Sequence, residues 1–278
     1  PEFALVYFYI ATGFFVGEGL LLTNRHVASL FVQGVGAGPK YLRFQPERTA
    51  RMDPRYEVGD PDTIAGGDRF EVVESLLVHP YWDAALLRVR PVGAAVLPRA
   101  LKLAWRRPPS FGGGATPLVV VIGYPALDSR NNIGQQMNIF RGIFNRKRLM
   151  PGYLVGFDNV ETSWKATLHA ATHDASTLGG NSGSAVIDVE SGLVLALHFG
   201  GRYLIANYGV PGWELAQDGR VVDLGVQFAD YPGQPPAEQT VALPALPPDW
   251  VKTWETVKTL VPETVATAEA APADVAGG

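Results

Sequence analysis

The segment Gly179-Gly180-Asn181-Ser182-Gly183-Ser184 places a serine between glycines, with apolar runs on both sides. Glycines let the backbone turn sharply, so the hydroxyl of Ser182 can be exposed beside unobstructed amide N–H groups. A nucleophile needs both features. The hexapeptide alone is a weak indication of catalysis, because a serine in a glycine-rich turn of a β protein is usually structural.

A histidine and an aspartate lie upstream of this serine, each at the end of an apolar strand. His26 lies in residues 21–28, and Asp83 lies in residues 79–87. A serine hydroxyl is a poor nucleophile at neutral pH and needs a base within hydrogen-bond reach, for which His26 is the candidate. Asp83 would accept the other imidazole N–H, fix the tautomer and stabilise the imidazolium.

The turn that carries the serine can also supply an oxyanion hole. The backbone N–H groups on either side of Asn181, those of Gly180 and Ser182, would bind the developing negative charge, and one misplaced donor would cost about 3 kcal/mol. Taken singly, these residues have other roles. Asp83 could cap a turn, and a lone buried histidine is usually a hydrogen-bonded core residue.

Three further histidines are alternative bases. His79 precedes a proline, so it is expected to shape a loop. His169 and His173 lie in the apolar run before the serine turn. We expect them to line a wall and not to act as the base. The histidines are scattered along the chain, so we expect no metal and no cofactor.

The composition indicates a globular β protein. The chain has 278 residues, of which 47% are hydrophobic, with 31 glycines and 22 prolines. We therefore expect a buried core with many turns. A formal net charge of -4 gives no long-range attraction to nucleic acid or an anionic membrane, so we expect neither as a partner.

Cysteine is absent from the chain, which excludes disulfides, cysteine nucleophiles and thiolate metal sites. The apolar segment 3–22 is interrupted by Gly13 and Gly17, which favours strands over a membrane span. This segment also lacks the basic and small-residue parts of a signal peptide. These features favour the cytoplasm, and secretion stays open because some secreted bacterial enzymes lack disulfides.

Short β-rich runs separated by turn clusters form two successive parts of the chain. Residues 1–104 carry His26 and Asp83, residues 105–116 form a connector rich in proline and glycine, and residues 117–211 carry Ser182. This pattern predicts an all-β fold of two packed antiparallel barrels, each with about six strands. The expected strands are 3–10, 14–16, 20–22, 40–44, 70–78, 84–89, 117–122, 138–144, 153–157, 165–170, 185–188, 193–199 and 203–208.

Residues 212–261 have a different character. The stretch from Pro232 to Pro248 predicts a proline-rich strap along the surface. Asp249 can then cap a C-terminal helix with one apolar face, which Pro262 would end. The alanine-rich residues 262–278 predict a disordered tail or linker that leads to an additional domain or partner. The apolar face would consist of Trp250, Val251, Trp254, Val257, Leu260 and Val261.

The order His26, Asp83, Ser182 resembles that of the trypsin-like serine proteases. The sequences of the matching segments are most similar to those of the disulfide-free bacterial branch that includes glutamyl endopeptidases. The resemblance covers about residues 3–211. It implies a chymotrypsin-like fold and hydrolysis of a protein or peptide substrate through an acyl-enzyme. The segments that carry it are Thr12-Gly13-Phe14-Phe15-Val16, Leu22-Thr23-Asn24-Arg25-His26-Val27, Asp83-Ala84-Ala85-Leu86, Gly180-Asn181-Ser182-Gly183-Ser184 and Leu197-His198-Phe199-Gly200-Gly201.

Asn181 departs from the pattern of the digestive members of this family. Those enzymes carry an aspartate at this position, which pairs with a new N-terminal amine and orders the oxyanion hole after activation. An amide cannot make that ion pair. The resemblance therefore implies an enzyme that is not switched on by this route.

The resemblance also implies a specificity pocket. Ser176 would lie at its base, which argues against a strict preference for Lys or Arg. Thr177 and His198 match positions that hold the glutamate side chain in glutamyl endopeptidases, so we expect Glu or Gln before the scissile bond. Gly200 and Gly201 would leave room for the substrate backbone to pair as an added strand.

Two functions of different class remain. The first is a serine endopeptidase that uses the three polar residues, and the second is a catalytically silent, protease-like binding or scaffold module. A lipase-type hydrolase is excluded, because its serine would precede both the acid and the histidine and would open a helix. Here both residues come first, and residues 185–188 are expected to form a strand.

Overall fold

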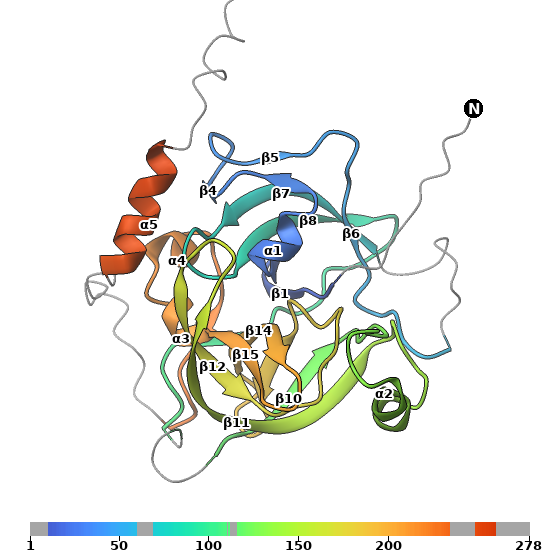
Figure 1. The fold of residues 1–278 in the computed structure, drawn as a ribbon. Coiled ribbons are helices and arrows are strands. Elements are labelled where there is room, and N and C mark those ends of the chain that lie inside the picture. The colour runs from blue at the N-terminus through green and yellow to red at the C-terminus, as the bar shows by residue number, and fades with distance from the viewer. Residues whose placement is uncertain (1–10, 60–68, 110, 112–115, 234–247, 260–278) are drawn as a thin grey trace, which may run out of the picture.

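The computed structural model describes residues 11–59, 69–109, 111, 116–233 and 248–259. Two curved β sheets lie one above the other in Figure 1, with the short helix α1 between them. The helices are α1 (Arg25–Ala28), α2 (Ile133–Phe140), α3 (Gly212–Leu215), α4 (Gly219–Asp223) and α5 (Pro248–Thr259). None of these helices of the described chain is long and apolar enough to cross a membrane.

The first sheet comes from the N-terminal half of the chain. Its strands follow the order β1-β2-β8-β7-β4, and β6 pairs with a different part of β7. A separate two-stranded sheet joins β3 and β5. The bounds are β1 (Phe14–Gly17), β2 (Leu20–Thr23), β3 (Val32–Gln33), β4 (Gly36–Ala37), β5 (Arg43–Phe44), β6 (Arg51–Met52), β7 (Arg69–Val78) and β8 (Ala85–Val92).

The second sheet is a closed antiparallel barrel. Its strands follow the order β13-β10-β11-β12-β15-β14, and the additional pairing of β13 with β14 closes the ring. The short strand β9 pairs in parallel with β14, and β16 pairs in parallel with β9. The bounds are β9 (Leu103–Ala104), β10 (Leu118–Gly123), β11 (Arg148–Glu161), β12 (Thr167–His173), β13 (Ala185–Asp188), β14 (Val194–Arg202), β15 (Ala206–Pro211) and β16 (Phe228–Ala229). The expected all-β, two-barrel fold is confirmed.

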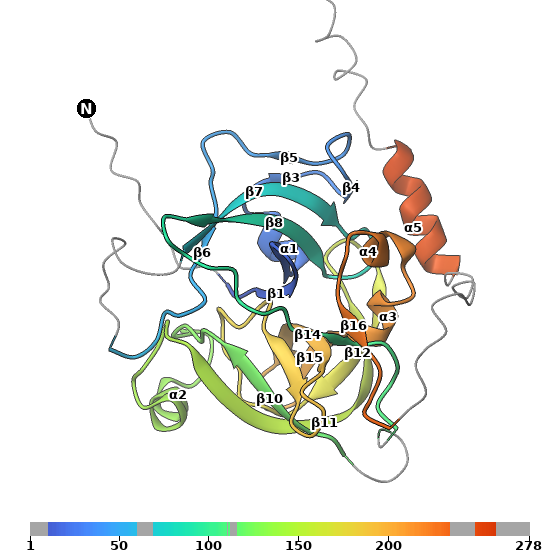
Figure 2. The same cartoon turned by 180° about the vertical axis from the view of Figure 1, so that it is seen from behind.

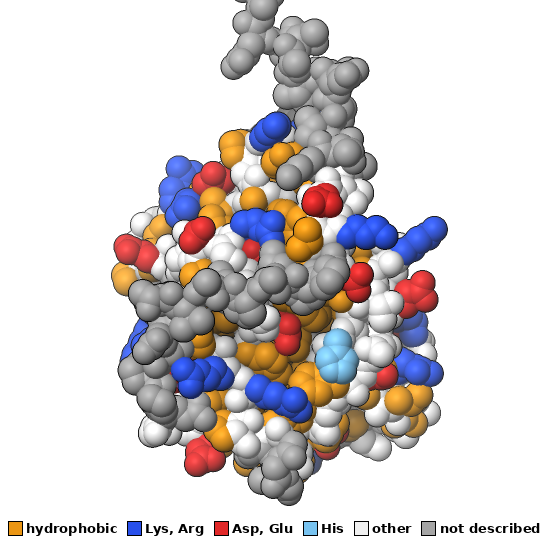
Figure 3. Space-filling model, turned by 90° about the vertical axis from the view of Figure 1, so that its left-hand side faces the viewer, with side chains coloured by type: hydrophobic (Ala, Val, Ile, Leu, Met, Phe, Trp, Pro, Cys, Tyr) orange, Lys and Arg blue, Asp and Glu red, His pale blue; other side chains and the backbone are white. Residues whose placement is uncertain are grey.

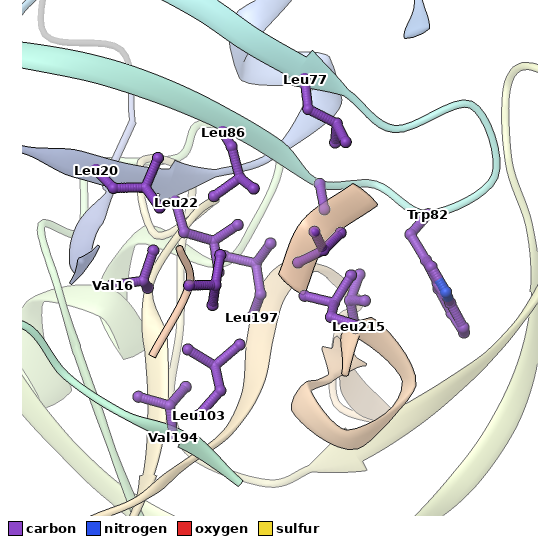
Figure 4. Packing of buried hydrophobic residues seen from close by; sticks show 14 of the residues in the cluster. Val16, Leu20, Leu22, Leu77, Trp82, Leu86, Leu103, Val194, Leu197 and Leu215 are labelled. Atoms are coloured by element: carbon purple, nitrogen blue, oxygen red, sulfur yellow. The ribbon is translucent and has the colours of Figure 1, made fainter. Parts of the chain in front are cut away.

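The apolar strands of the first sheet are buried on both faces. Phe15 and Leu21 belong to the core of the first barrel, whereas their neighbours Val16 and Leu22 belong to a cluster between the two barrels. Strand residues alternate between the two faces of a sheet. A strand that is covered on both sides therefore has a continuous apolar sequence. Figure 4 shows this shared cluster, in which Leu197 of the second barrel lies among these side chains.

The sequence prediction was wrong at residues 138–144. A strand was expected there, but the segment Ile133–Phe140 is helix α2. The side chain of Asn132 accepts the N–H of Gln135 at 3.0 Å and caps this helix. Of the expected strand 40–44, only Arg43–Phe44 is extended. The expected strand 3–10 lies outside the described residues.

The region after the second barrel contains more helix than the sequence suggested, because α3 and α4 precede the proline-rich stretch. That stretch lies mostly outside the described residues. The C-terminal helix is present as α5, which packs against the first barrel (Figure 2). Trp250 and Val257 are buried in this contact, but Val251 is 40% exposed. The expected apolar face is therefore narrower than predicted.

The surface carries charges of both signs. On the side of the molecule that bears α5, basic and acidic side chains alternate over the surface, with hydrophobic side chains between them (Figure 3). This distribution agrees with the net charge of -4.

Candidate active site

His26 and Asp83 are in direct contact. His26 lies in α1, directly after β2, and Asp83 lies in the loop between β7 and β8. The Nδ1 of His26 is 2.7 Å from the Oδ2 of Asp83, and the backbone N–H of His26 donates to Oδ1 at 3.0 Å. The aspartate is buried, whereas the imidazole side chain is 42% exposed. The carboxylate therefore holds a proton on Nδ1 and leaves Nε2 as the basic nitrogen.

Two neighbours of His26 fix the loop that carries Asp83. Asn24 stands at the N-cap of α1, but its side chain donates to the carbonyl of Asp83 at 2.9 Å and does not cap the helix. Arg25 donates to the carbonyl of Pro80 at 2.7 Å and lies 4.2 Å from the ring centre of Trp164. Burial lowers the pKa of Arg25 to about 10, so this side chain is still charged at neutral pH.

The turn around Ser182 is bonded to the first barrel. Thr12 donates its N–H to the carbonyl of Ser182 and its hydroxyl to the carbonyl of Gly180, each at 2.8 Å. The hydroxyl of Thr23 donates to the carbonyl of Thr12 at 2.8 Å. Thr23 ends β2, three residues before His26. The turn of the candidate nucleophile and the candidate base are therefore tied to the same strand end.

A glycine is required next to the candidate nucleophile. Gly183 has a φ of +90°, and a Cβ at this position would lie 1.9 Å from the carbonyl oxygen of Thr12. Gly180 also has a positive φ, of 86°. The glycines thus allow the turn to approach Thr12 closely, as expected for a nucleophile turn.

Asn181 points into the second barrel and is fully buried. Its side chain donates to the carbonyl of Leu178 at 3.3 Å and accepts the hydroxyl of Ser184 at 3.5 Å. A Cβ at Gly123 would lie 2.0 Å from the hydroxyl oxygen of Ser184. The amide is therefore packed tightly into the barrel wall, without an ionic partner.

His198 lies beside this turn. Its backbone N–H donates to Ser184, and its carbonyl accepts the N–H of Gly183, each at 2.9 Å. The imidazole is buried, with Nδ1 3.1 Å from the Nε2 of His173. Burial lowers the pKa of His198 well below its ordinary value, and the charges of His173 and His26 lower it further. His198 is therefore neutral at neutral pH.

The remaining candidate pocket residues surround Asn207 or are exposed. Thr177 donates its hydroxyl to Asn207 Oδ1 at 2.6 Å, and Asn207 Nδ2 donates to the carbonyl of Ala175 at 2.8 Å. A Cβ at Gly201 would lie 2.3 Å from Asn207 Oδ1, whereas a Cβ at Gly200 would meet nothing within 4 Å. Ser176 is exposed. A side chain at Gly200 would therefore enter open space, whereas the missing Cβ of Gly201 makes room for Asn207.

The alternative bases are engaged elsewhere. Both ring nitrogens of His79 are bonded: Nδ1 accepts the N–H groups of Tyr81 and Trp82, and Nε2 lies 3.1 Å from Asp218. His169 is exposed and stacks on Phe157. His173 is buried against His198. His79 thus shapes its loop, as its sequence context suggested.

Two buried aspartates were not selected from the sequence. Asp218 caps α4 and is fully buried, and it accepts bonds from His79, Arg220 and Trp254. Asp128 is 8% exposed and lies beside Gly179. Both stand in Gly- and polar-rich loops, where a single acidic residue gives no periodic signal. No cluster of three or more His, Asp or Glu side chains in the described part of the chain could hold a metal ion.

The paired antiparallel barrels, with a histidine and an aspartate on the first and a glycine-flanked serine on the second, define the class of chymotrypsin-fold proteins. The chain belongs to the trypsin-like peptidase domain family, whose model matches residues 11–197. It is 29% identical over 225 residues to a probable serine protease of Lysobacter enzymogenes. That alignment covers 73% of this chain and 56% of the relative, so the chain spans little more than half of the relative's length.

Solved structures of proteases resemble the chain more distantly. The Rv3671c protease from M. tuberculosis, in its active form, is 20% identical, with a TM-score of 0.44 over 78% of this chain and 74% of that chain. The HtrA-type protease AlgW with a decapeptide is 16% identical, with a TM-score of 0.45 over 78% of this chain and 52% of that chain. The glutamyl endopeptidase branch stays a prediction.

Proposed function

We propose that the protein is a serine endopeptidase in which Ser182, His26 and Asp83 form the catalytic triad. The observation that carries this proposal is the contact between His26 and Asp83. A buried carboxylate binds both the backbone N–H and Nδ1 of the histidine, so Nε2 of the half-exposed ring is the nitrogen that faces away from the carboxylate. The hydrogen bonds from Thr12 that hold the serine turn against the end of β2 support the same assignment.

The reaction proceeds in two steps. In the first, the Oγ of Ser182 bonds to the carbonyl carbon of the substrate while His26 Nε2 takes the hydroxyl proton, and His26 then gives this proton to the leaving amine as the C–N bond breaks. Water releases the acyl group by the same proton transfers in reverse. The N–H groups of Gly180 and Ser182 bind the negative charge on the carbonyl oxygen, and Asp83 stabilises the imidazolium.

The hydrogen bonds around His198 support a preference for Gln or Glu before the scissile bond. The Nδ1 of His173 has no partner among the described residues. A nitrogen without a partner is better tolerated as an acceptor than as an N–H, so the proton of His173 lies on Nε2 and is donated to His198. The proton of His198 then lies on Nε2, from which it can donate to a side-chain oxygen of the substrate.

Thr177 distinguishes the two substrates. Because Asn207 Nδ2 is committed to the carbonyl of Ala175, Asn207 Oδ1 faces Thr177 and uses its hydroxyl proton. The oxygen of Thr177 can then only accept, which suits the NH₂ group of glutamine and not a carboxylate. Between the two expected side chains, we propose that glutamine is preferred.

The triad is tested with a fluorophosphonate probe and a peptide library. Wild-type protein should label and cleave, whereas Ser182→Ala and His26→Ala should do neither, and His169→Gln, a change of an exposed histidine, should keep full activity. Folded wild-type protein that never labels would instead support the silent scaffold. Cleavage mainly after Lys, Arg or large aromatic residues would refute the proposed preference, but not the triad.

A further inference from the structure

The backbone just before the candidate oxyanion hole is held from both sides. The carbonyl of Gly179 accepts the N–H of Ala126 at 2.7 Å. The next carbonyl, that of Gly180, accepts the hydroxyl of Thr12 at 2.8 Å. In a planar trans peptide the C=O and N–H point in opposite directions. The bond from Ala126 therefore directs the N–H of Gly180 away from Ala126 and fixes its orientation.

A carboxylate completes this arrangement. The Oδ2 of Asp128 lies 3.6 Å from the position that a Cβ of Gly179 would occupy, and Asp128 is only 8% exposed. Hydrogen bonds, first from the Arg130 side chain and then from backbone N–H groups that include that of Gly179, hold the pKa of Asp128 below its ordinary value, against the effect of burial. The carboxylate is therefore ionised throughout the neutral range.

The loop that carries Asp128 is itself rigid. Gln136, a buried residue of α2, accepts the N–H of Asp128 at 2.9 Å and donates to its carbonyl at 2.7 Å. Arg130 binds the carboxylate through Nε at 2.8 Å and Nη2 at 2.6 Å. The guanidinium compensates the negative charge, which would otherwise oppose the formation of an oxyanion nearby.

We infer that Asp128 is a positioning residue for the oxyanion hole, which it orders by holding Gly179 together with the N–H of Ala126. This inference rests on the proposed function. It also explains how the turn is ordered although Asn181 cannot form an ion pair. The order comes from a loop of the same barrel, so it does not depend on a free N-terminal amine.

The test compares variants of Asp128 with a substrate chosen from the library digest and a peptide aldehyde of the same sequence. The aldehyde forms a hemiacetal with the nucleophile and occupies the oxyanion hole, so its affinity follows transition-state binding. Asp128→Ala should lower kcat about tenfold or more, weaken aldehyde binding by a similar factor and change KM less than about threefold. Asp128→Asn should fall between this variant and wild type, because its amide oxygen can still accept an N–H.

Controls separate this inference from the proposed function. Asp223→Ala removes an exposed carboxylate on α4. It should leave kcat, KM and the affinity for the aldehyde unchanged. If Asp128→Ala folds and keeps the wild-type kcat and aldehyde affinity, the inference is overturned while the triad stands. If Asp128→Ala does not fold, an unchanged kcat and aldehyde affinity in Asp128→Asn overturn the inference in the same way. A lower kcat in Asp128→Ala without weaker aldehyde binding also refutes the inference. Activity that survives in Ser182→Ala refutes the proposed function instead.

Discussion

Three buried histidines should make the protein sensitive to mild acid. His79, His173 and His198 are at most 2% exposed. Burial is the largest cause that lowers the pKa of each, and for His173 it lowers the value from 6.5 to about 4 against the opposing charge of Asp174. These side chains bind protons more weakly in the folded protein than in the unfolded chain.

The sign and the size of the effect follow from this difference. Below pH 6.5 the unfolded chain takes up a proton at His173, but the folded protein does so only near pH 4, so the free energy of unfolding falls as the pH falls between these values. For this side chain alone, the loss between pH 7 and pH 5 is about 2 kcal/mol. The lowered pKa values of His79 and His198 add to this loss with the same sign. Since domains are stable by about 5–15 kcal/mol, unfolding should begin near pH 5.

The assay is urea unfolding at pH 7, 6 and 5, monitored by tryptophan fluorescence. The Ser182→Ala variant is used so that the protein does not digest itself. In that background, His173→Phe should make the free energy of unfolding depend less steeply on pH. The change in slope should correspond to about one fewer proton taken up on unfolding. His169→Gln is the matched control, because His169 is exposed, and it should leave the slope unchanged. A flat profile in the parent protein, or an unchanged slope in His173→Phe, would refute the reasoning.

Three further substitutions test other parts of the structure. Asp218→Ala removes the buried partner of His79 and Arg220 and should destabilise the protein by about 3–5 kcal/mol in urea unfolding; a loss below about 1 kcal/mol would contradict this. Gly183→Ala should be folded poorly or be inactive, since its Cβ would collide with the carbonyl of Thr12, and normal kcat would show that the turn is more adaptable than described. Asp83→Asn should lower kcat about 10⁴-fold with little change in melting temperature, and a loss below about tenfold would argue against the proposed tautomer of the base.

The strands that surround the candidate site could be predicted from the sequence. The runs Phe14–Gly17 and Leu20–Thr23 are continuously apolar because one face fills the first barrel and the other faces the second. Such runs are recognisable without knowledge of their partners. The helix α2 was missed for the opposite reason. Its buried residues, Gln136 and Phe140, are four positions apart, but one of them is polar, so the helical period is hidden in a hydropathy pattern.

Asp128 and Asp218 could not be selected from the sequence, because their importance lies in contacts far along the chain. Asp218 is bonded to His79, which is 139 positions away. Asp128 lies beside Gly179 in space, although the two are separated by α2, β11 and β12. A hydrophobic pattern indicates which face of a strand is buried. It contains no information about which carboxylate is placed against which backbone amide.

The part of the chain that the structure describes contains two aspartate–histidine ion pairs, and their surroundings differ. In both, a carboxylate oxygen lies close to a ring nitrogen, at 2.7 Å for His26 and 3.1 Å for His79. Two backbone N–H groups and Asp218 occupy both ring nitrogens of His79 inside a fully buried cluster, so this histidine can exchange no proton with a substrate. Asp83 occupies only one nitrogen of His26, whose side chain is 42% exposed. The free nitrogen and its access to solvent, not the ion pair itself, therefore distinguish the proposed general base His26 from the structural histidine His79.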